Sequence, residues 1–245
     1  MSNTSGALAL VGSGEYLPVM ADLESWLLEQ AVARGKSRRF VQIPTAAGLE
    51  SADSLKYWRE LGAAQAERIN AEQIFLPIFN RSDAMDESHV AQIHDAGLIY
   101  LSGGNPIHLA QSLVDTPVWN AIKFNWESGT SLAGCSAGAM AMSSDVPHFF
   151  RMKEEGEPGL GITPHIRTIP HYNKFFGWIP DKAAKIMMKA PEGVVIIGID
   201  EETALVKEDG LAPWRVVGKA SVHVLHGAPT QKFGSGEIVE LNPAK

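Results

Sequence analysis

Short apolar runs alternate with longer amphipathic stretches through the first 140 residues, and this alternation limits the folds that the chain can adopt. Five of the runs are bounded by Gly, Pro or Ser and are too short for helices, so they predict buried strands. They are residues 7–11, 40–43, 73–78, 97–101 and 131–134. The stretches 19–33, 53–69, 86–96 and 118–127 predict helices, because their apolar residues recur at helical spacing.

Strands that alternate with helices form parallel sheets, because each right-handed crossover returns the chain to the same end of the sheet. The sequence therefore predicts an α/β protein with a doubly wound, three-layer, mostly parallel sheet. Residues 145–178 mix charged and aromatic side chains without a clear period. Strand patterns return at 194–199, 203–207, 214–217 and 222–225, where we expect antiparallel strands at a sheet edge. We expect one domain over residues 1–245.

Composition and charge exclude several classes of function. Of the 245 residues 45% are hydrophobic and 20% charged, which is enough to bury a core and excludes a disordered linker. The net charge of −7 argues against nucleic acid or an anionic membrane as the main partner, because both bind clustered positive charge. Cys135 is the only cysteine, so no intrachain disulfide can form. Because we also find neither an apolar leader nor a run of about 18 apolar residues, we expect a cytoplasmic protein.

The segment Gly134-Cys135-Ser136-Ala137-Gly138 lies where the fifth predicted strand ends, and it fits a Gly-x-Ser-x-Gly nucleophile elbow. A nucleophile on a tight strand-to-helix turn has strained backbone geometry, and side chains two positions away on either side would collide with neighbouring backbone. Both of those positions are glycine. We expect the amide of Ala137, at the start of the following helix, to stabilise an oxyanion beside Ser136.

Cys135 is the other candidate nucleophile in this turn, since class I glutamine amidotransferases build the same elbow around a cysteine. The positions two residues before and after Cys135 are Ala133 and Ala137, so Cys135 lacks the glycines that a nucleophile elbow requires. We interpret Cys135 as a small buried neighbour of Ser136.

The segment Gly103-Gly104-Asn105 follows the fourth predicted strand, at the sheet edge where doubly wound proteins bind ligands. Glycines there let backbone amides approach a substrate, so Gly104 can supply a second oxyanion donor.

A serine nucleophile also needs a base, and the candidates are His148, His165 and His171, which all lie in the irregular segment 145–178. We prefer His171, because residues 167–170 resemble a short strand that would hold it at the same edge.

Taken together, Gly103-Gly104-Asn105, the elbow around Ser136 and Pro170-His171-Tyr172 resemble the serine peptidase family of aspartyl dipeptidase (dipeptidase E) and cyanophycinase. Residues 198–204 look like the corresponding stretch of cyanophycinases, so the resemblance spans about 7–206. It implies the flavodoxin-like sheet of the class I amidotransferase-like superfamily, a homodimer, and no metal or organic cofactor. It also implies that Ser136 is the nucleophile and that His171 is the general base and acid.

The acid that supports the histidine is less clearly marked. The dipeptidase branch has an aspartate shortly after the serine, and no Asp stands at that place here. Cyanophycinases resemble this sequence better at Glu201, which we prefer over Asp145 and Glu154. The chain order of serine, histidine and acid differs from that of α/β-hydrolases, which is acceptable because triads are defined by geometry.

The resemblance implies acyl transfer to water from a short peptide or isopeptide. Ile169-Pro170 stands before the histidine in place of the acidic-polar pair of cyanophycinases, and the arginines that follow the histidine there are absent here. We therefore expect a more apolar pocket, lined partly by Phe175, Phe176 or Trp178. Two other classes remain open: a binding module that keeps the fold without a working acid, and a cysteine-dependent enzyme that uses Cys135.

Overall fold

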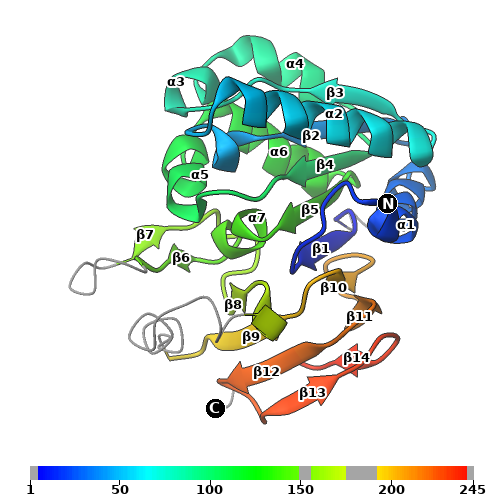
Figure 1. The fold of residues 1–245 in the computed structure, drawn as a ribbon, viewed down its shortest axis with the longest axis vertical. Coiled ribbons are helices and arrows are strands. Elements are labelled where there is room, and N and C mark those ends of the chain that lie inside the picture. Colours follow the sequence, from blue (N-terminus) through cyan, green and yellow to red (C-terminus); the bar gives the residue numbers. More distant parts are fainter. Residues whose placement is uncertain (1–4, 149–155, 175–191, 242–245) are drawn as a thin grey trace.

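The computed structural model describes residues 5–148, 156–174 and 192–241, and it is built around an eight-stranded sheet (Figure 1). The strands stand in the order β14-β11-β10-β1-β5-β4-β2-β3. Their bounds are Leu8–Val11 (β1), Arg39–Ile43 (β2), Glu72–Phe75 (β3), Leu98–Leu101 (β4), Ser131–Cys135 (β5), Thr203–Lys207 (β10), Trp214–Gly218 (β11) and Ile238–Val239 (β14). Strands β1 to β5 run parallel, and β10, β11 and β14 extend the sheet antiparallel beyond β1. The predicted fold class is confirmed.

Helices cover both faces of this sheet, and Figure 1 shows α2 in front of it and α6 behind. The helices are Ala21–Val32 (α1), Ala52–Arg68 (α2), Arg81–Ala84 (α3), Val90–Ile93 (α4), Pro106–Leu113 (α5), Pro117–Glu127 (α6) and Ala137–Ala141 (α7), with short 3-10 helices at Pro18–Met20, Thr45–Ala47 and Glu87–His89. In β1, Ala9 and Val11 pack with α1 and α2, whereas Leu8 and Leu10 belong to the core on the other face. Because both faces are buried, successive strand positions must be apolar, which explains the continuous apolar runs.

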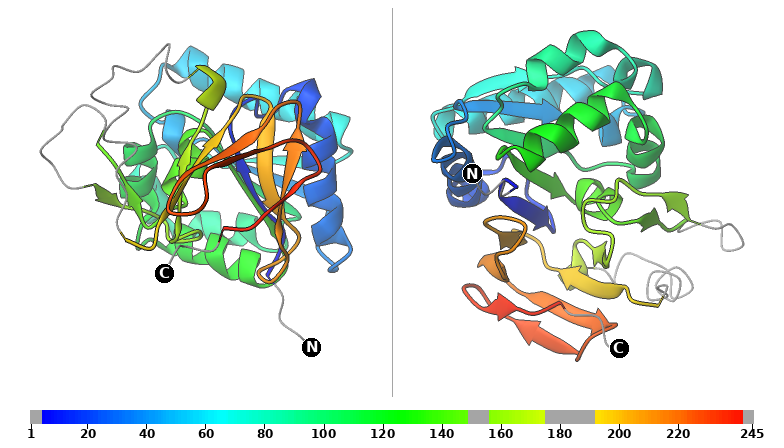
Figure 2. Two further views of the ribbon diagram at one scale, coloured as in Figure 1. Left: turned by 90° about the horizontal axis from the view of Figure 1, so that it is seen from below. Right: turned by 180° about the vertical axis from the view of Figure 1, so that it is seen from behind.

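A second, four-stranded sheet lies beyond β10, at the lower end of the molecule in Figure 1 and in the right view of Figure 2. Its order is β13-β12-β9-β8, with bounds Gln231–Phe233, Val222–His226, Val195–Ile199 and Ile166–Ile169. The short pair Asp145–Val146 (β6) and Glu157–Pro158 (β7) stands apart.

Two sequence-based expectations need correction. Of the late strands, β10 and β11 extend the main sheet as expected, but β9 and β12 belong to the second sheet, and β9 pairs parallel with β8. An apolar run shows that a strand is buried but not which strand it pairs with. The helix expected over 86–96 is a 3-10 turn followed by the short α4, because His94 has an extended ψ of 136° and Asp95 a φ of 59°. These two residues turn the chain into β4.

Within the described ranges, no helix combines the length and the apolar character that a membrane crossing requires.

Candidate active site

A cavity of about 860 Å³ opens where β4 and β5 end. The loop after β4 supplies Gly104 and Asn105 to its wall, and the start of α7 supplies Ser136 and Ala137. The remaining described residues of the lining come from the helical segments after β2, β4 and β5, from the chain after β6, and from β7: Ala46, Leu49, Glu50, Pro106, Ile107, Gln111, Met140, His148 and Glu157. The carboxyl edge of a doubly wound sheet is where such proteins bind ligands.

Ser136 stands on the turn between β5 and α7, with φ 50° and ψ −107°, a backbone conformation that L residues rarely adopt. A Cβ on Gly134 would lie 2.6 Å from the Gly138 carbonyl carbon, and one on Gly138 would lie 2.4 Å from the Leu101 carbonyl oxygen. The turn therefore closes only with glycine at both positions, as the nucleophile-elbow prediction requires.

His171 lies at the end of β8, and its Nε2 is 3.2 Å from Ser136 Oγ. Its Nδ1 is 3.1 Å from Oε1 of Glu201, which follows β9. The structure thus brings together the three side chains that the sequence analysis selected, although Ser136 and His171 are 35 residues apart along the chain and His171 and Glu201 are 30 residues apart. The backbone amide of Glu201 also donates to Asn173 Oδ1 at 3.1 Å, and this bond connects the loop after β8 with the loop after β9.

The ring of Tyr172 helps to fix this histidine loop. It lies against Gly198 of β9, where a Cβ would come within 2.4 Å of the ring. The glycine therefore leaves the space that the aromatic side chain occupies. The ring also contacts the imidazole of His223, the β12 residue paired with Gly198, at 4.6 Å between centroids. His223 Nε2 in turn lies 3.2 Å from both carboxylate oxygens of the buried Asp200.

Gly104 and Ala137 line the cavity, and among the described hydrogen bonds neither of their backbone amides has a protein acceptor. Gly104 has a φ of 136°, and a Cβ there would lie 2.4 Å from the Ala46 carbonyl oxygen. The side chain of Asn105 also lines the cavity, but its Oδ1 caps α5 by accepting from the amides of Ile107 and His108, each at 3.0 Å. Gly103 is buried, and its amide points away toward Glu15.

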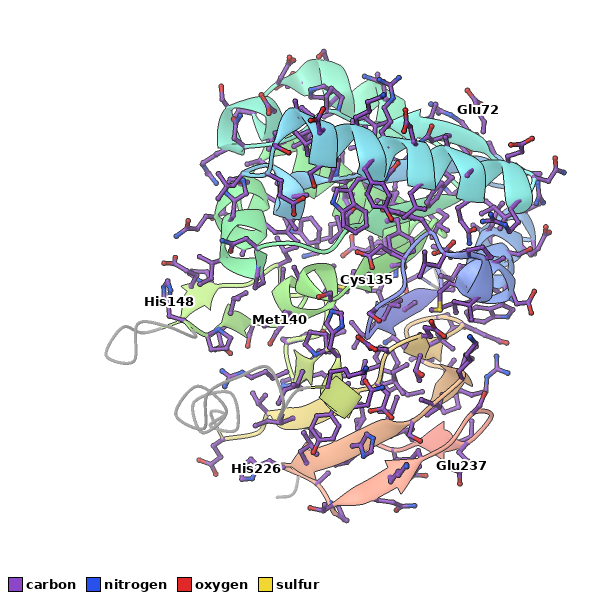
Figure 3. The ribbon with its side chains drawn as sticks, viewed as in Figure 1. Glu72, Cys135, Met140, His148, His226 and Glu237 are labelled. Atoms are coloured by element: carbon purple, nitrogen blue, oxygen red, sulfur yellow. The ribbon has the colours of Figure 1, made fainter. Side chains whose placement is uncertain are left out.

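Of the other candidates, His148 lines the same cavity. His148 lies 3.1 Å from Glu157, at the outer part of the molecule near β7 (Figure 3), and His165 is exposed. Asp145 is hydrogen-bonded to Arg167. Glu154 and the aromatic residues Phe175, Phe176 and Trp178, which we expected in the pocket, lie outside the described residues.

Cys135 is fully buried, as predicted for a small neighbour of the nucleophile, and it belongs to the core on the face of the sheet opposite α7. Its Sγ donates to Glu15 Oε2 at 2.9 Å. Burial, followed by the charge of Glu15, raises the pKa of this thiol well above its usual value. A thiol held in the protonated form away from the cavity is a poor nucleophile.

The sequence analysis missed Glu15, which follows β1 in the segment Gly12-Ser13-Gly14-Glu15 and is buried. A charged residue after two glycines at the carboxyl end of a predicted strand was the available signal. Its carboxylate accepts from the Gly103 amide at 2.8 Å and from Cys135.

A second buried carboxyl group, Glu24 on α1, lies deeper behind the site. Its Oε1 accepts from Tyr16 N at 3.2 Å, and its Oε2 accepts from Gln65 Nε2. Burial raises its pKa from 4.5 to about 8, and the hydrogen bonds from Gln65 and Tyr16 only partly oppose this shift. The folded protein therefore holds a proton on Glu24 at neutral pH.

This raised pKa predicts how stability depends on pH. The folded state binds the Glu24 proton more tightly than the unfolded state does, so its contribution is present below about pH 4.5 and is lost as pH rises toward 8. The loss is about 5 kcal/mol at most. Urea unfolding at pH 5, 6.5 and 8 should show stability falling across this window, and the fall should be much smaller in Glu24→Gln.

The matched control is Glu29→Gln, on the same helix but with 53% of the Glu29 side chain exposed, and it should keep the pH slope of the wild type. An equal slope in Glu24→Gln and wild type would show that this carboxyl group is ionised in the fold.

A doubly wound sheet with a Gly-x-Ser-x-Gly turn at the end of a central strand, and antiparallel strands after it, defines an α/β protein with a nucleophile-elbow site. Within that class, the family model of peptidase family S51 matches residues 8–213, and the chain belongs to this family.

Similar proteins agree with this assignment. Cyanophycinase from Synechococcus elongatus is 27% identical over 181 residues, which are 69% of this chain and 51% of that protein. Cyanophycinase from Nostoc sp. is 28% identical over 221 residues, 83% of this chain and 68% of that protein. The chain thus spans about half the length of the first of these relatives and two thirds of the second.

Solved structures are similar over more of their length. The crystal structure of a peptidase from an acI-B1 Actinobacterium has 50% sequence identity and a TM-score of 0.94, and the match covers 98% of each chain. A putative peptidase E protein from Listeria monocytogenes has 21% identity and a TM-score of 0.61, with 88% of this chain and 98% of that chain covered. The second match supports the fold alone.

Proposed function

We propose that this protein is a serine peptidase of the dipeptidase E and cyanophycinase type, which hydrolyses a short peptide or isopeptide through an acyl-enzyme. The observation that carries the proposal is the chain of contacts from Ser136 Oγ to His171 Nε2 and from His171 Nδ1 to Glu201 Oε1, at 3.2 and 3.1 Å, beside the cavity. A nucleophile whose base is oriented by a third group is the arrangement that nucleophilic acyl transfer needs.

In the first half of the reaction, His171 Nε2 takes the proton of Ser136 Oγ as the oxygen attacks the substrate carbonyl. The carbonyl π electrons move to its oxygen, and the amides of Gly104 and Ala137 donate hydrogen bonds to the resulting oxyanion. When the tetrahedral intermediate collapses, the scissile C–N bond breaks and His171 gives its proton to the leaving amine. Glu201 accepts a hydrogen bond from Nδ1 and stabilises the imidazolium that forms between these steps.

In the second half, a water molecule takes the place of the leaving amine. His171 removes one of its protons, the hydroxide oxygen attacks the acyl-enzyme, and the ester bond to Ser136 breaks as the serine recovers its proton. The products are a carboxylate and an amine, and the enzyme returns to its starting state.

The substrate that we propose is a short peptide with apolar character near the scissile bond. The described cavity lining includes Leu49, Ile107 and Met140, and it contains no Lys or Arg that would grip an aspartyl carboxylate. The acidic groups of Glu50 and Glu157 in the wall also disfavour an anionic side chain there.

The test uses the purified protein and a fluorophosphonate probe, with the modified residue located by mass spectrometry, followed by a panel of dipeptides and isopeptides. We expect modification of Ser136 and faster cleavage of apolar dipeptides than of Asp-Xaa or β-aspartyl-arginine. A folded protein that does not react would instead be a binding module. Rapid cleavage of the two aspartyl substrates would leave the mechanism standing and refute the apolar pocket.

A further inference from the structure

Glu15 is a buried carboxyl group that the proposed mechanism does not use. Its side chain reaches from the end of β1 to two neighbouring strand ends: Oε1 accepts from Gly103 N after β4, and Oε2 accepts from Cys135 Sγ at the end of β5. Glu15 is 7% exposed, and among the described ion pairs none includes it. Burying a carboxyl group without a cation beside it is costly, so the hydrogen bonds from Gly103 N and Cys135 Sγ must stabilise Glu15 in this position.

The contact with Gly103 fixes one side of the loop that carries the candidate oxyanion donor. The amide of Gly103 donates to Glu15 at 2.8 Å, and the amide of Asn105 donates to the Ala46 carbonyl at 2.8 Å. Between these two anchors stands Gly104, which is exposed to the cavity and whose amide has no protein acceptor among the described hydrogen bonds. With both neighbours held, the direction of the Gly104 amide is fixed.

We propose that Glu15 is a positioning residue, which holds the Gly103 amide so that the next amide, that of Gly104, points at the oxyanion beside Ser136. This inference rests on the proposed serine peptidase function. Catalytic stabilisation of an oxyanion depends on donors that stand in place before the charge develops, and a donor displaced by about 1 Å loses much of its effect. Glu15 touches no substrate atom; it acts through the loop.

The test compares three variants, two at Glu15 and one at Cys135. Glu15→Leu is similar in size and offers no acceptor, so the Gly103 amide is left unpaired and the loop is released. Glu15→Gln keeps an acceptor oxygen for Gly103. Cys135→Ser keeps a donor for the other carboxylate oxygen and leaves the Gly103 contact untouched.

We expect kcat to fall between about 10- and 100-fold in Glu15→Leu, with KM changed less than about threefold. Glu15→Gln and Cys135→Ser should stay within about threefold of the wild type. A peptide aldehyde, which forms a hemiacetal with Ser136 and places its oxygen at the oxyanion position, should bind Glu15→Leu more weakly by a factor similar to the loss in kcat. A residue that only supported the fold would not produce this split between kcat and KM.

If Glu15→Leu fails to fold, Gly103→Ala perturbs the same contact from the other side. Its new Cβ would lie 2.6 Å from Glu15 Oε1, which must move, but at an ordinary 3.5 Å from Ser136 Cβ. We expect the same loss of kcat and the same weaker binding of the aldehyde.

Several results would overturn the inference. One is a folded Glu15→Leu with kcat within threefold of the wild type, and another is a Glu15→Gln that loses as much as Glu15→Leu, because charge rather than the Gly103 contact would then matter. These results are distinct from failure of the proposed function, in which the wild type itself would neither react with a fluorophosphonate nor cleave any peptide.

Discussion

Replacing Ser136 by alanine is expected to lower kcat by about 10⁴- to 10⁶-fold on whichever peptide the wild type cleaves, while KM and the unfolding midpoint change little. The hydroxyl is the atom that forms the acyl-enzyme, and no other described side chain near the cavity can replace it. Cys135 is adjacent in sequence, but its thiol is fully buried and donates to Glu15 on the other face of the sheet. The measurement is steady-state kinetics together with loss of fluorophosphonate labelling.

The matched control is Cys135→Ala, which removes the other nucleophile of the same turn. It should retain activity, because Cys135 does not line the cavity and the contact between Glu15 and the Gly103 amide remains. The reverse pattern, with activity lost in Cys135→Ala and kept in Ser136→Ala, would make the protein a cysteine-dependent enzyme and would refute the proposed mechanism.

Replacing His171 by glutamine is expected to lower kcat by about 10⁴-fold or more, because Ser136 then loses the base that contacts its Oγ and the leaving amine loses its acid. The histidine has a φ of 50°, and its loop is held by the Tyr172 ring and by the contact between Asn173 and Glu201. Glutamine keeps the size of the side chain, so the loss should appear in kcat without a large change in stability. The measurement is kcat on the best dipeptide together with urea unfolding.

A control for this variant is His165→Gln, which changes an exposed histidine of the same segment and should leave kcat unchanged. In the same assay, Glu201→Gln should reduce kcat more than Asp145→Asn, since Glu201 contacts His171 whereas Asp145 contacts Arg167. If His171→Gln kept more than a tenth of the wild-type rate, the base would have to be another group.

The parts of the fold that depend on local pattern could be predicted from the sequence. Apolar runs placed five parallel strands; β1, β2, β4 and β5 are buried on both faces of the sheet, whereas β3, at the edge, is only partly buried. The Ser136 turn was predictable because its glycines are a steric requirement within five residues. His171 was found through the short strand before it, and Glu201 through resemblance to a family. Their catalytic roles, the single domain and the homodimer stay predictions.

What the sequence could not supply was contact between distant segments. Glu15 lies 88 residues from Gly103 and 120 from Cys135, and no local spacing relates these positions. Likewise, the run at 195–199 has the composition of a buried strand in either sheet, and it joined the second sheet only because β8 and β12 lie beside it.

The amino-acid sequence by itself determined the order of strands and helices, the sharp bend that carries the Ser136 hydroxyl, and the set of imidazoles from which a base could come. Steric fit and the burial of apolar side chains act between near neighbours in the chain, so they can be read there. Only the tertiary structure decided which histidine meets that hydroxyl, that Asp145 pairs with Arg167 instead of the histidine, and that two carboxyl groups are buried behind the site. Hydrogen bonds and desolvation depend on which groups the packed sheet brings within about 3 Å of each other, and that is a property of the whole fold.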